Sequence, residues 1–312
     1  MMKVWKTLLL ISALLLMSCS DKTRPLKIGT NNWIGYESLY VIDKLNMLDE
    51  PLTLIRQSNA TDVMSLFEQG KIDVACLTLD EAMILIEKGV ELHFVSVMDV
   101  SNGADQVLAS EQVESITQLK DKRIGVETTA LGRLVLSSLL DHANLTLEDV
   151  EIVNSTVDKH FEMVQKNEID AAVTFPPFSD HMLNQGMHKL FDSSQMDDAP
   201  IIDVMVVNRY AKDSRKETLS QLINSLYKVN NRLLNKDPEV LKIVGTNLNL
   251  PPAEWPEMTT GVQLANKELN NTYINRYKLE ATMLILDEVM LNNGLLNQSI
   301  TEKVDTSMFV RL

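Results

Sequence analysis

Aromatic and polar residues follow the first apolar run of this 312-residue chain, where they could bind a small molecule. Asn32, Trp33 and Tyr36 come directly after the run 26–30. An aromatic ring face attracts a cation, so Trp33 and Tyr36 suit an amine ligand. Trp33 could instead pack in the core, but its polar neighbours favour a ligand platform.

Carboxylates stand at two further positions of the same kind. Asp80 and Glu81 follow the apolar run 72–77, together with Thr78, which is a further candidate to bind the ligand, and Asp105 closes a polar segment. Asp80 and Asp105 could attract an amine. Capping of the following helix is an alternative for Asp80 and Glu81, because carboxylates are favoured there. Asp105 could be a hinge residue only.

Hydroxyl groups follow a later run of the chain. Thr128 and Thr129 come after the run 124–126 and before a predicted helix, whose free amides form an anion site. They could bind an anion, cap the helix, or do both. Arg133 could pair with a ligand anion or with a nearby carboxylate. Phe175 follows the run 171–173 and is expected to shape the wall of the binding site.

Catalytic chemistry finds no support in the sequence. The five histidines form no His-x-x-x-His pair, and neither a Gly-x-Ser-x-Gly elbow nor a phosphate loop is present. We therefore expect no catalytic residue, no metal site and no cofactor. Cys76 is the single cysteine after position 19, and its apolar surroundings predict a small buried hydrophobe.

Strand-like runs alternate with helical patterns, which predicts an α/β fold with parallel sheet. The predicted strands are 26–30, 52–56, 72–77, 93–98, 124–126, 171–173 and 204–207. The predicted helices include 37–46, 62–69, 81–88, 219–234, 238–248 and 279–291. Asn59 or Thr61 could cap the second of these helices. In open parallel sheets ligands bind beyond the carboxyl ends of the strands, where the residues above lie.

A sequence pattern occurs twice at nearly the same spacing. The segment 27–29 (Lys-Ile-Gly) is echoed by 123–125 (Arg-Ile-Gly), and 69–75 is echoed by 166–172, each with a central Ile-Asp. Because the two echoes share their offset, we predict two lobes built on one plan. The polar segments 99–105 and 197–200 are the expected crossovers between the lobes.

The expected organisation follows from these crossovers. The first lobe comprises 26–100 and 203–312, with the C-terminal helices packed on it, and the second lobe comprises 101–202. The two Rossmann-like lobes would close on a central ligand cleft by hinge motion.

The first residues predict secretion. Lys3 and Lys6 precede an apolar run, 8–17, that is shorter than the ~20 residues of a spanning helix. Residues 1–18 thus read as a signal peptide, and 19–25 as a tether lipidated at Cys19, because residues 16–19 resemble the bacterial lipobox. An ordinary signal peptide is the alternative. Ser20 favours the outer membrane by the sorting rule of such lipoproteins.

The formal net charge is −14 at pH 7. An acidic surface repels nucleic acid and anionic lipid, so we expect no nucleic-acid partner and membrane association through the lipid alone. We expect a monomer.

The segment 27–30 with Trp33 and Gly35, the two Ile-Asp segments and the segment 120–126 together resemble one known family. This is the nitrate, sulfonate, taurine and thiamine-precursor group of substrate-binding proteins. The resemblance implies a type II periplasmic-binding fold and delivery of a ligand to the permease of an ABC importer. Phe175-Pro176-Pro177 departs from the Glu-Pro or similar pair often found there.

The sequence leaves the ligand and the partner open. A taurine-like zwitterion suits Asp80 and Asp105 on one side and Thr128 and Thr129 on the other. A thiamine-precursor pyrimidine stacked on Trp33 is the alternative. The same clamshell could present its closed form to a membrane receptor as a sensor. The resembled fold family also includes thiamine-pyrimidine synthases, which carry a cysteine-rich motif. That activity is disfavoured here, since the motif is missing.

Overall fold

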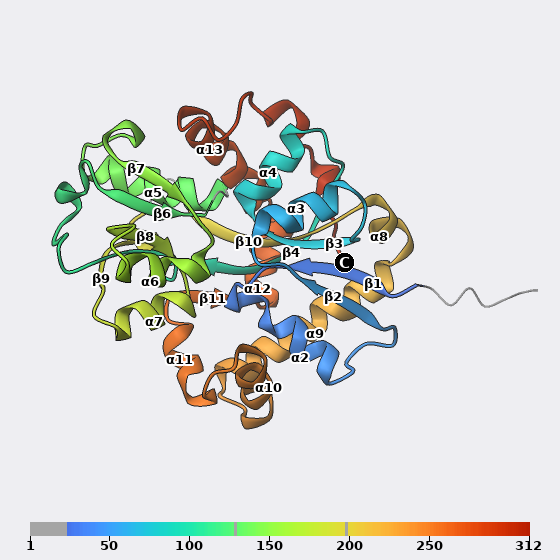
Figure 1. Ribbon diagram of the computed structural model, residues 1–312. Helices are drawn as coiled ribbons and strands as arrows, with labels where there is room; N and C mark the ends of the chain where they lie inside the picture. The colour runs from blue at the N-terminus through green and yellow to red at the C-terminus, as the bar shows by residue number, and fades with distance from the viewer. Residues whose placement is uncertain (1–23, 128–129, 197–198) are drawn as a thin grey trace, which may run out of the picture.

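Two sheets with their helices form the two parts of the molecule in the computed structural model, which describes residues 24–127, 130–196 and 199–312 (Figure 1). The predicted signal peptide, Cys19 and the threonines at 128 and 129 lie outside these residues. No helix among the described residues has the length and apolar character needed to cross a bilayer.

The first lobe is built on a six-stranded sheet in the order β11-β4-β10-β3-β1-β2. Its strands are β1 (Leu26–Thr30), β2 (Leu52–Arg56), β3 (Val74–Thr78), β4 (His93–Ser101), β10 (Ile201–Val207) and β11 (Val262–Leu264). Its helices are α2 (Glu37–Lys44), α3 (Ala60–Glu68), α4 (Leu79–Glu87), α8 (Arg209–Ser214), α9 (Lys216–Leu234), α10 (Pro238–Leu248), α11 (Trp255–Met258), α12 (Lys267–Asn270) and α13 (Lys278–Asn292).

The second lobe is built on a five-stranded sheet in the order β7-β6-β8-β5-β9. Its strands are β5 (Gln106–Ala109), β6 (Arg123–Val126), β7 (Glu151–Asn154), β8 (Ala171–Thr174) and β9 (His188–Asp192). Its helices are α5 (Ala130–His142), α6 (Val157–Gln165) and α7 (Phe178–Asn184).

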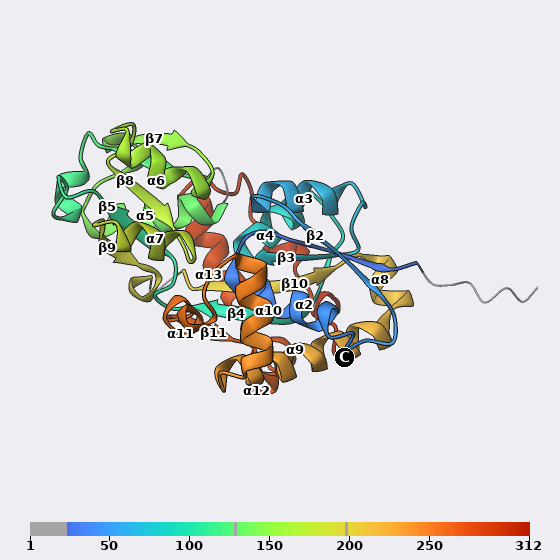
Figure 2. The same ribbon diagram turned by 60° about the horizontal axis from the view of Figure 1, so that its bottom comes forward.

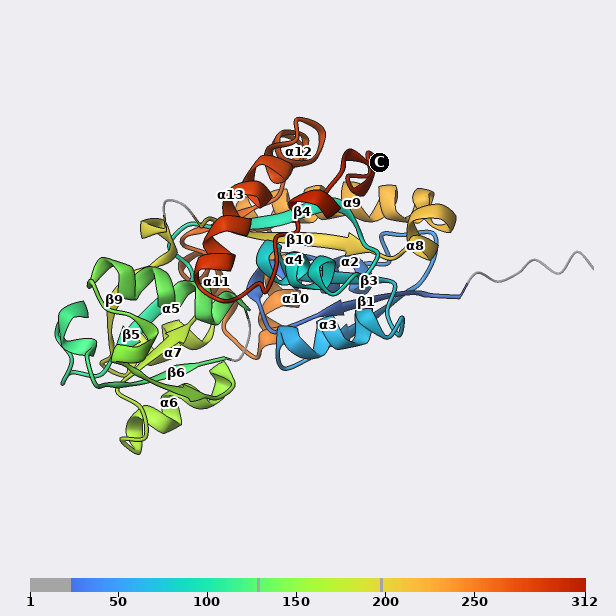
Figure 3. The same ribbon diagram turned by 90° about the horizontal axis from the view of Figure 1, so that it is seen from above.

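Helices cover both faces of the first sheet, because successive side chains of a strand point to opposite faces. Ala75 and Leu77 of β3 pack in one core with α3, α4 and α13, while Val74 and Cys76 pack in another with α2, α9 and α10. The expected C-terminal helices therefore lie on the first lobe. In Figures 2 and 3 the second lobe stands beside it, and α4 contacts α5 across the junction.

The sheets are mixed, which corrects the expectation of parallel sheet. β1, β2 and β3 are parallel, as are β6, β7 and β8, but β10 runs antiparallel to β3 and β4, and β5 runs antiparallel to β8 and β9. The chain leaves the first sheet along β4, and each sheet receives an antiparallel strand where the chain crosses between lobes. The segment 99–105 was expected to be a crossover between the lobes, but its first three residues belong to a strand. β4 continues to Ser101 and is paired there with β10 and β11.

The internal repeat is visible in the strand register. Ile28 and Gly29 of β1 pair with Val74 and Ala75, while Ile124 and Gly125 pair with Ala171 and Ala172. The equivalent strands β1 and β6 are thus flanked in the same way, in the orders β2-β1-β3 and β7-β6-β8. The two equivalent glycines have the same neighbour, because an added Cβ would lie 2.5 Å from Ile72 Cδ1 in one lobe and 2.6 Å from Ile169 Cδ1 in the other, so a larger residue would have to displace that isoleucine.

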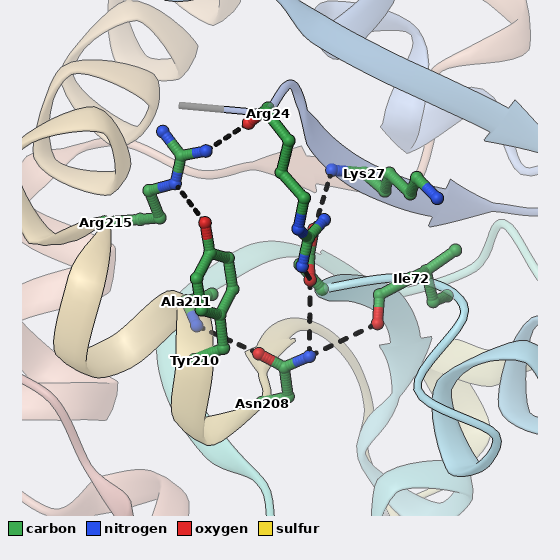
Figure 4. Close-up of polar contacts among 8 residues, drawn as sticks. Arg24, Lys27, Ile72, Asn208, Tyr210, Ala211 and Arg215 are labelled. Atoms are coloured by element: carbon green, nitrogen blue, oxygen red, sulfur yellow. Dashed lines mark hydrogen bonds and ion pairs between the residues drawn. The ribbon is translucent and has the colours of Figure 1, made fainter. Parts of the chain in front are cut away.

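The repeated aspartate ties two strands together in each lobe. Asp73 accepts the backbone N–H of Lys27 (3.1 Å) and the guanidinium of Arg24 (2.6 and 2.7 Å). Figure 4 labels Lys27 and Arg24 and marks the bonds that they make. Asp170 accepts the backbone N–H (2.9 Å) and the guanidinium of Arg123 in the same arrangement. The Ile-Asp motif therefore has a structural role in both copies.

Candidate functional site

The lobes meet through an aromatic contact between two residues that the sequence predicts to bind ligand. Trp33 follows β1 in the first lobe, and Phe175 follows β8 in the second. Their ring centroids are 5.8 Å apart, edge to face, and Trp33 is only 5% exposed. A parallel strand delivers the residues after its carboxyl end to one edge of the sheet, which explains why both rings reach the junction.

Trp33 is oriented by a buried carboxylate. Its indole N–H donates to both oxygens of Asp99, at 3.1 and 3.2 Å, and Asp99 lies on β4. Gly35 permits this arrangement, since any side chain there would collide with the Asp99 carboxylate and the Trp33 indole. The polar turn after β1 thus reaches the strand on which the chain leaves for the second lobe.

Tyr36 makes the corresponding contact with the returning strand. Its hydroxyl donates to Asp203 of β10, and both residues are buried. Asp203 and Asp99 are register partners on adjacent strands. Burial raises the pKa of Asp99 to about 7 and the pKa of Asp203 well above its usual range, and the charge of Asp99 adds to the latter.

Asp80 and Glu81 begin α4 with both carboxyls buried. Glu81 Oε2 accepts the backbone N–H of Thr78 at 3.0 Å, so Glu81 caps the helix, which is one of its two expected roles. Asp80 is 2% exposed, and its Oδ2 has no hydrogen-bond partner among the described residues. Burial raises the pKa of Asp80 to about 6.

Asp105 joins the same group from the crossover before β5. It is buried, and its backbone N–H donates to Ser101 Oγ at 3.2 Å. Burial raises the pKa of Asp105 to about 7, and the charge of Asp80 adds to the rise. Burial raises the pKa of Glu81 well above its usual range, the charge of Asp80 adds to the rise, and the charge of Glu127, which follows β6 in the second lobe, adds a smaller part. Carboxyls from both lobes therefore act on one another.

These residues form a buried group that we call the acidic cluster. Its members are Asp80, Glu81, Asp99, Asp105 and Asp203. Each has a raised pKa with burial as the largest cause. No ion pair joins any of them to a lysine or arginine within the described part of the chain. The buried Glu37 differs, because Arg56 lies 2.5 Å from its carboxylate.

Most of the predicted residues come together here. Trp33, Tyr36, Thr78, Asp80, Asp105 and Phe175 all lie at the junction. Asn32 is half-buried beside Trp33. Arg133 is exposed on the first turn of α5. The predicted anion side, Thr128 and Thr129, falls outside the described residues.

Asp99 and Asp203 belong to the site although the sequence patterns do not single them out as ligand-binding residues. Each is the lone carboxylate of a buried strand, His93–Ser101 or Ile201–Val207, and a charge in such a strand is the available signal. The polar pattern around Asp99 instead indicates a connecting segment. Among the described residues, no group of three or more His, Cys, Asp or Glu side chains has a geometry that could hold a metal ion.

Two α/β lobes joined by crossing strands, with side chains from both meeting at the strand ends, define the architecture of a periplasmic binding protein. The chain belongs to the NMT1-like family, whose model matches residues 20–244. No curated protein is similar enough in sequence to be matched.

Solved structures share the fold at low sequence identity. The alkanesulfonate-binding protein SsuA from Xanthomonas axonopodis pv. citri, bound to MOPS, is 15% identical with a TM-score of 0.72, over 89% of this chain and 96% of that one. The ligand-binding component of an ABC-type import system from Staphylococcus aureus is 15% identical with a TM-score of 0.73, over 92% and 98%. The periplasmic aliphatic sulphonate binding protein SsuA from Escherichia coli is 14% identical with a TM-score of 0.72, over 92% and 97%.

Proposed function

We propose that this chain is the solute-binding component of an ABC importer and captures a small polar molecule where its two lobes meet. The observation that carries the proposal is the meeting of buried polar and aromatic side chains from both lobes, with Trp33 against Phe175 and Asp80 beside Asp105. Closing the lobes would surround a ligand with these groups. The family and the neighbouring import components support the same function.

The proposed ligand is a taurine-like zwitterion. Its amine would lie against Asp80 and Asp105, whose carboxyls have no cationic partner among the described side chains. Its anionic end would lie against Thr128, Thr129 and the start of the following helix, as the sequence suggests. The chain would work in the periplasm, anchored by a lipid on Cys19, as a monomer without catalytic activity.

Native mass spectrometry of protein purified from its own host tests this function. We expect a bound small molecule, released on denaturation, that restores the added mass when returned to the emptied protein. Small-angle scattering should then show that the emptied protein becomes more compact on addition of that compound. The result that contradicts the proposal is a protein that carries no small molecule from its host and does not become more compact with any of a panel of small zwitterions, sulfonates and pyrimidines.

A matched pair of variants controls for surface effects. Asp80→Asn keeps the shape of the side chain and removes its charge, and should lose the bound compound. Asp141→Asn makes the same change at an exposed position of α5 and should retain it.

A further inference from the structure

We propose that the acidic cluster is an ammonium site that releases protons to water when the positive charge of a ligand enters it. This rests on the proposed function and deepens it, because it makes positive charge the property that the site selects and makes capture proton-coupled. No bond other than O–H is broken. A carboxyl proton of the cluster goes to water, and the resulting carboxylate pairs with the ammonium group.

The first step is the arrangement of the carboxyls. Asp99 and Asp203 are register partners on the neighbouring strands β4 and β10, and Asp203 is also the register partner of Thr78, the residue directly before α4 with its Asp80 and Glu81. Asp105 lies just before β5, and its backbone N–H donates to Ser101 at the end of β4. Like charges gathered in one buried site cannot all ionise, so protons must be held within the cluster when no cation is present.

The second step is the lack of internal compensation. Buried charges in proteins are normally paired, as Glu37 is with Arg56. The described groups that face the acidic cluster supply no positive charge. Tyr36 of the turn after β1, Cys76 of β3 and Glu127 after β6 are the other titratable ones, and none is a cation at neutral pH.

The third step is that buried polar atoms at the junction await a partner. Asp80 Oδ2 has no hydrogen-bond partner among the described residues although Asp80 is 2% exposed. Gln106 Oε1 and Thr174 Oγ1 also have none there, and these two are register partners on β5 and β8, adjacent to Asp105 and Phe175. Unpaired buried acceptors are costly, and an ammonium group supplies the donors that would satisfy them.

The chemistry predicts the direction of the pH dependence. Asp80 has a pKa of about 6, and Asp99 and Asp105 have pKa values of about 7. An aliphatic ammonium keeps its proton across this range. Its affinity should therefore rise between about pH 5.5 and pH 8, by up to ~tenfold per pH unit for each proton released. A site that selects the anionic end of a ligand has no reason to show this rise.

Two matched pairs of probes test the proposal. Taurine and isethionate differ only in an ammonium against a hydroxyl group, and putrescine and 1,4-butanediol differ in the same way. Each is titrated into the protein by calorimetry at several pH values, and proton release is measured by pH-stat in weakly buffered solution. We expect taurine or putrescine to bind at least ~tenfold more tightly than its hydroxyl counterpart, with protons released.

Variants assign the protons to the cluster. Asp80→Asn should lower the affinity for the amine that binds by ten- to a hundredfold and reduce the proton release, with Asp105→Asn as the second variant if the first does not fold. Asp141→Asn should change neither. Equal binding of a hydroxyl counterpart, amine binding without proton release, or failure of both amines to bind would overturn the proposal. A neutral or anionic compound found on the native protein would then leave the solute-binding function standing and remove only the ammonium site.

Discussion

Asp99 and Asp203 face each other as register partners on β4 and β10, the strands along which the chain leaves and re-enters the first sheet. Each is held by an aromatic side chain from the turn after β1, Asp99 by the Trp33 indole and Asp203 by the Tyr36 hydroxyl. The strands that link the lobes and the residues proposed to bind ligand are therefore one connected structure.

The stability of the ligand-free protein should reflect this buried pair. The pKa of Asp99 is about 7 when folded and ~3.9 when unfolded, so the folded state binds more protons between these values. The contribution of the protonated Asp99 carboxyl to the free energy of unfolding is fully present below about pH 4 and is lost as the pH rises to about 7. Relative to wild type, Asp99→Asn should gain at least ~1 kcal/mol of unfolding free energy between pH 4 and pH 8. Urea denaturation at several pH values measures this gain, and a difference that does not change with pH would refute the raised pKa.

Gly35 should tolerate no side chain. A Cβ at this position would collide with the Asp99 carboxylate and the Trp33 indole, so Gly35→Ala must displace one of them. We expect a loss of ~1–3 kcal/mol of unfolding free energy and an altered Trp33 fluorescence spectrum. Gly294→Ala is a control for backbone effects, because Gly294 has a positive φ of 64° but open space around it. A Gly35→Ala protein with wild-type fluorescence would show that the turn is not packed against Trp33 and Asp99.

Replacing either repeated aspartate should destabilise the protein, and the loss should be larger at Asp73 than at Asp170. Asp73→Ala leaves the Lys27 N–H and the half-exposed Arg24 guanidinium without their buried acceptor, and we expect a loss of ~1–3 kcal/mol. Asp170→Ala removes the same contacts at a more exposed position, since the Asp170 side chain is 19% exposed against 1% for Asp73. Thermal and chemical denaturation compare the two. An Asp170→Ala loss larger than that of Asp73→Ala would contradict the role of burial.

Replacing Cys19 and replacing Cys76 should have different effects, the first on membrane attachment and the second on stability. Replacing Cys19 with Ser is expected to move the protein from the membrane fraction to the soluble periplasmic fraction, because the lipid has no other attachment point. Fractionation and mass spectrometry of the N-terminal peptide check this, and retention of the Cys19→Ser protein in the membrane would refute lipidation. Cys76→Ala should leave fractionation unchanged and cost a little stability, since Cys76 is a buried free thiol in the first-lobe core.

The repeat and several buried strands and helices could be predicted from the sequence, because apolar runs, capping residues and prolines mark them locally. The predicted strands at 26–30 and 52–56 match β1 and β2 residue for residue, and α10 matches the prediction at 238–248, with Asp237 capping it and Pro238 at its first turn. Asn59, one of two proposed caps, accepts the N–H of Asp62 at 2.8 Å.

The strands that escaped prediction have weak patterns for physical reasons. β7 (Glu151–Asn154), β9 (His188–Asp192) and β11 (Val262–Leu264) lie at sheet edges, where fewer side chains are buried and no apolar run is needed. The fourth, β5 (Gln106–Ala109), is interior to its sheet but only four residues long, too short for a clear pattern. The antiparallel entry of β10 and β5 also has no local signal, because strand direction depends on how the chain crosses between lobes.

Some residues of the candidate site could likewise be predicted from the sequence, and others could not. Trp33, Asp80 and Phe175 could be named because each directly follows a recognisable strand. The pairing of Asp99 with Asp203 could not, since it depends on register between strands that lie about a hundred positions apart in the chain. The lack of a described cation beside the acidic cluster is likewise a property of the folded arrangement alone.

The central claim is that a ligand carrying an amine is held between the lobes, and calorimetry on three variants tests it most directly. With the compound that co-purifies, Asp80→Asn and Thr129→Val should each lower affinity by ten- to a hundredfold, equivalent to ~1.5–3 kcal/mol for a lost charged contact. Trp33→Ala should also weaken binding but should not be the only variant that does so. If Trp33→Ala abolishes binding while Asp80→Asn and Thr129→Val bind as the wild type does, the ligand is a flat ring stacked on Trp33, and the protein does not select an amine.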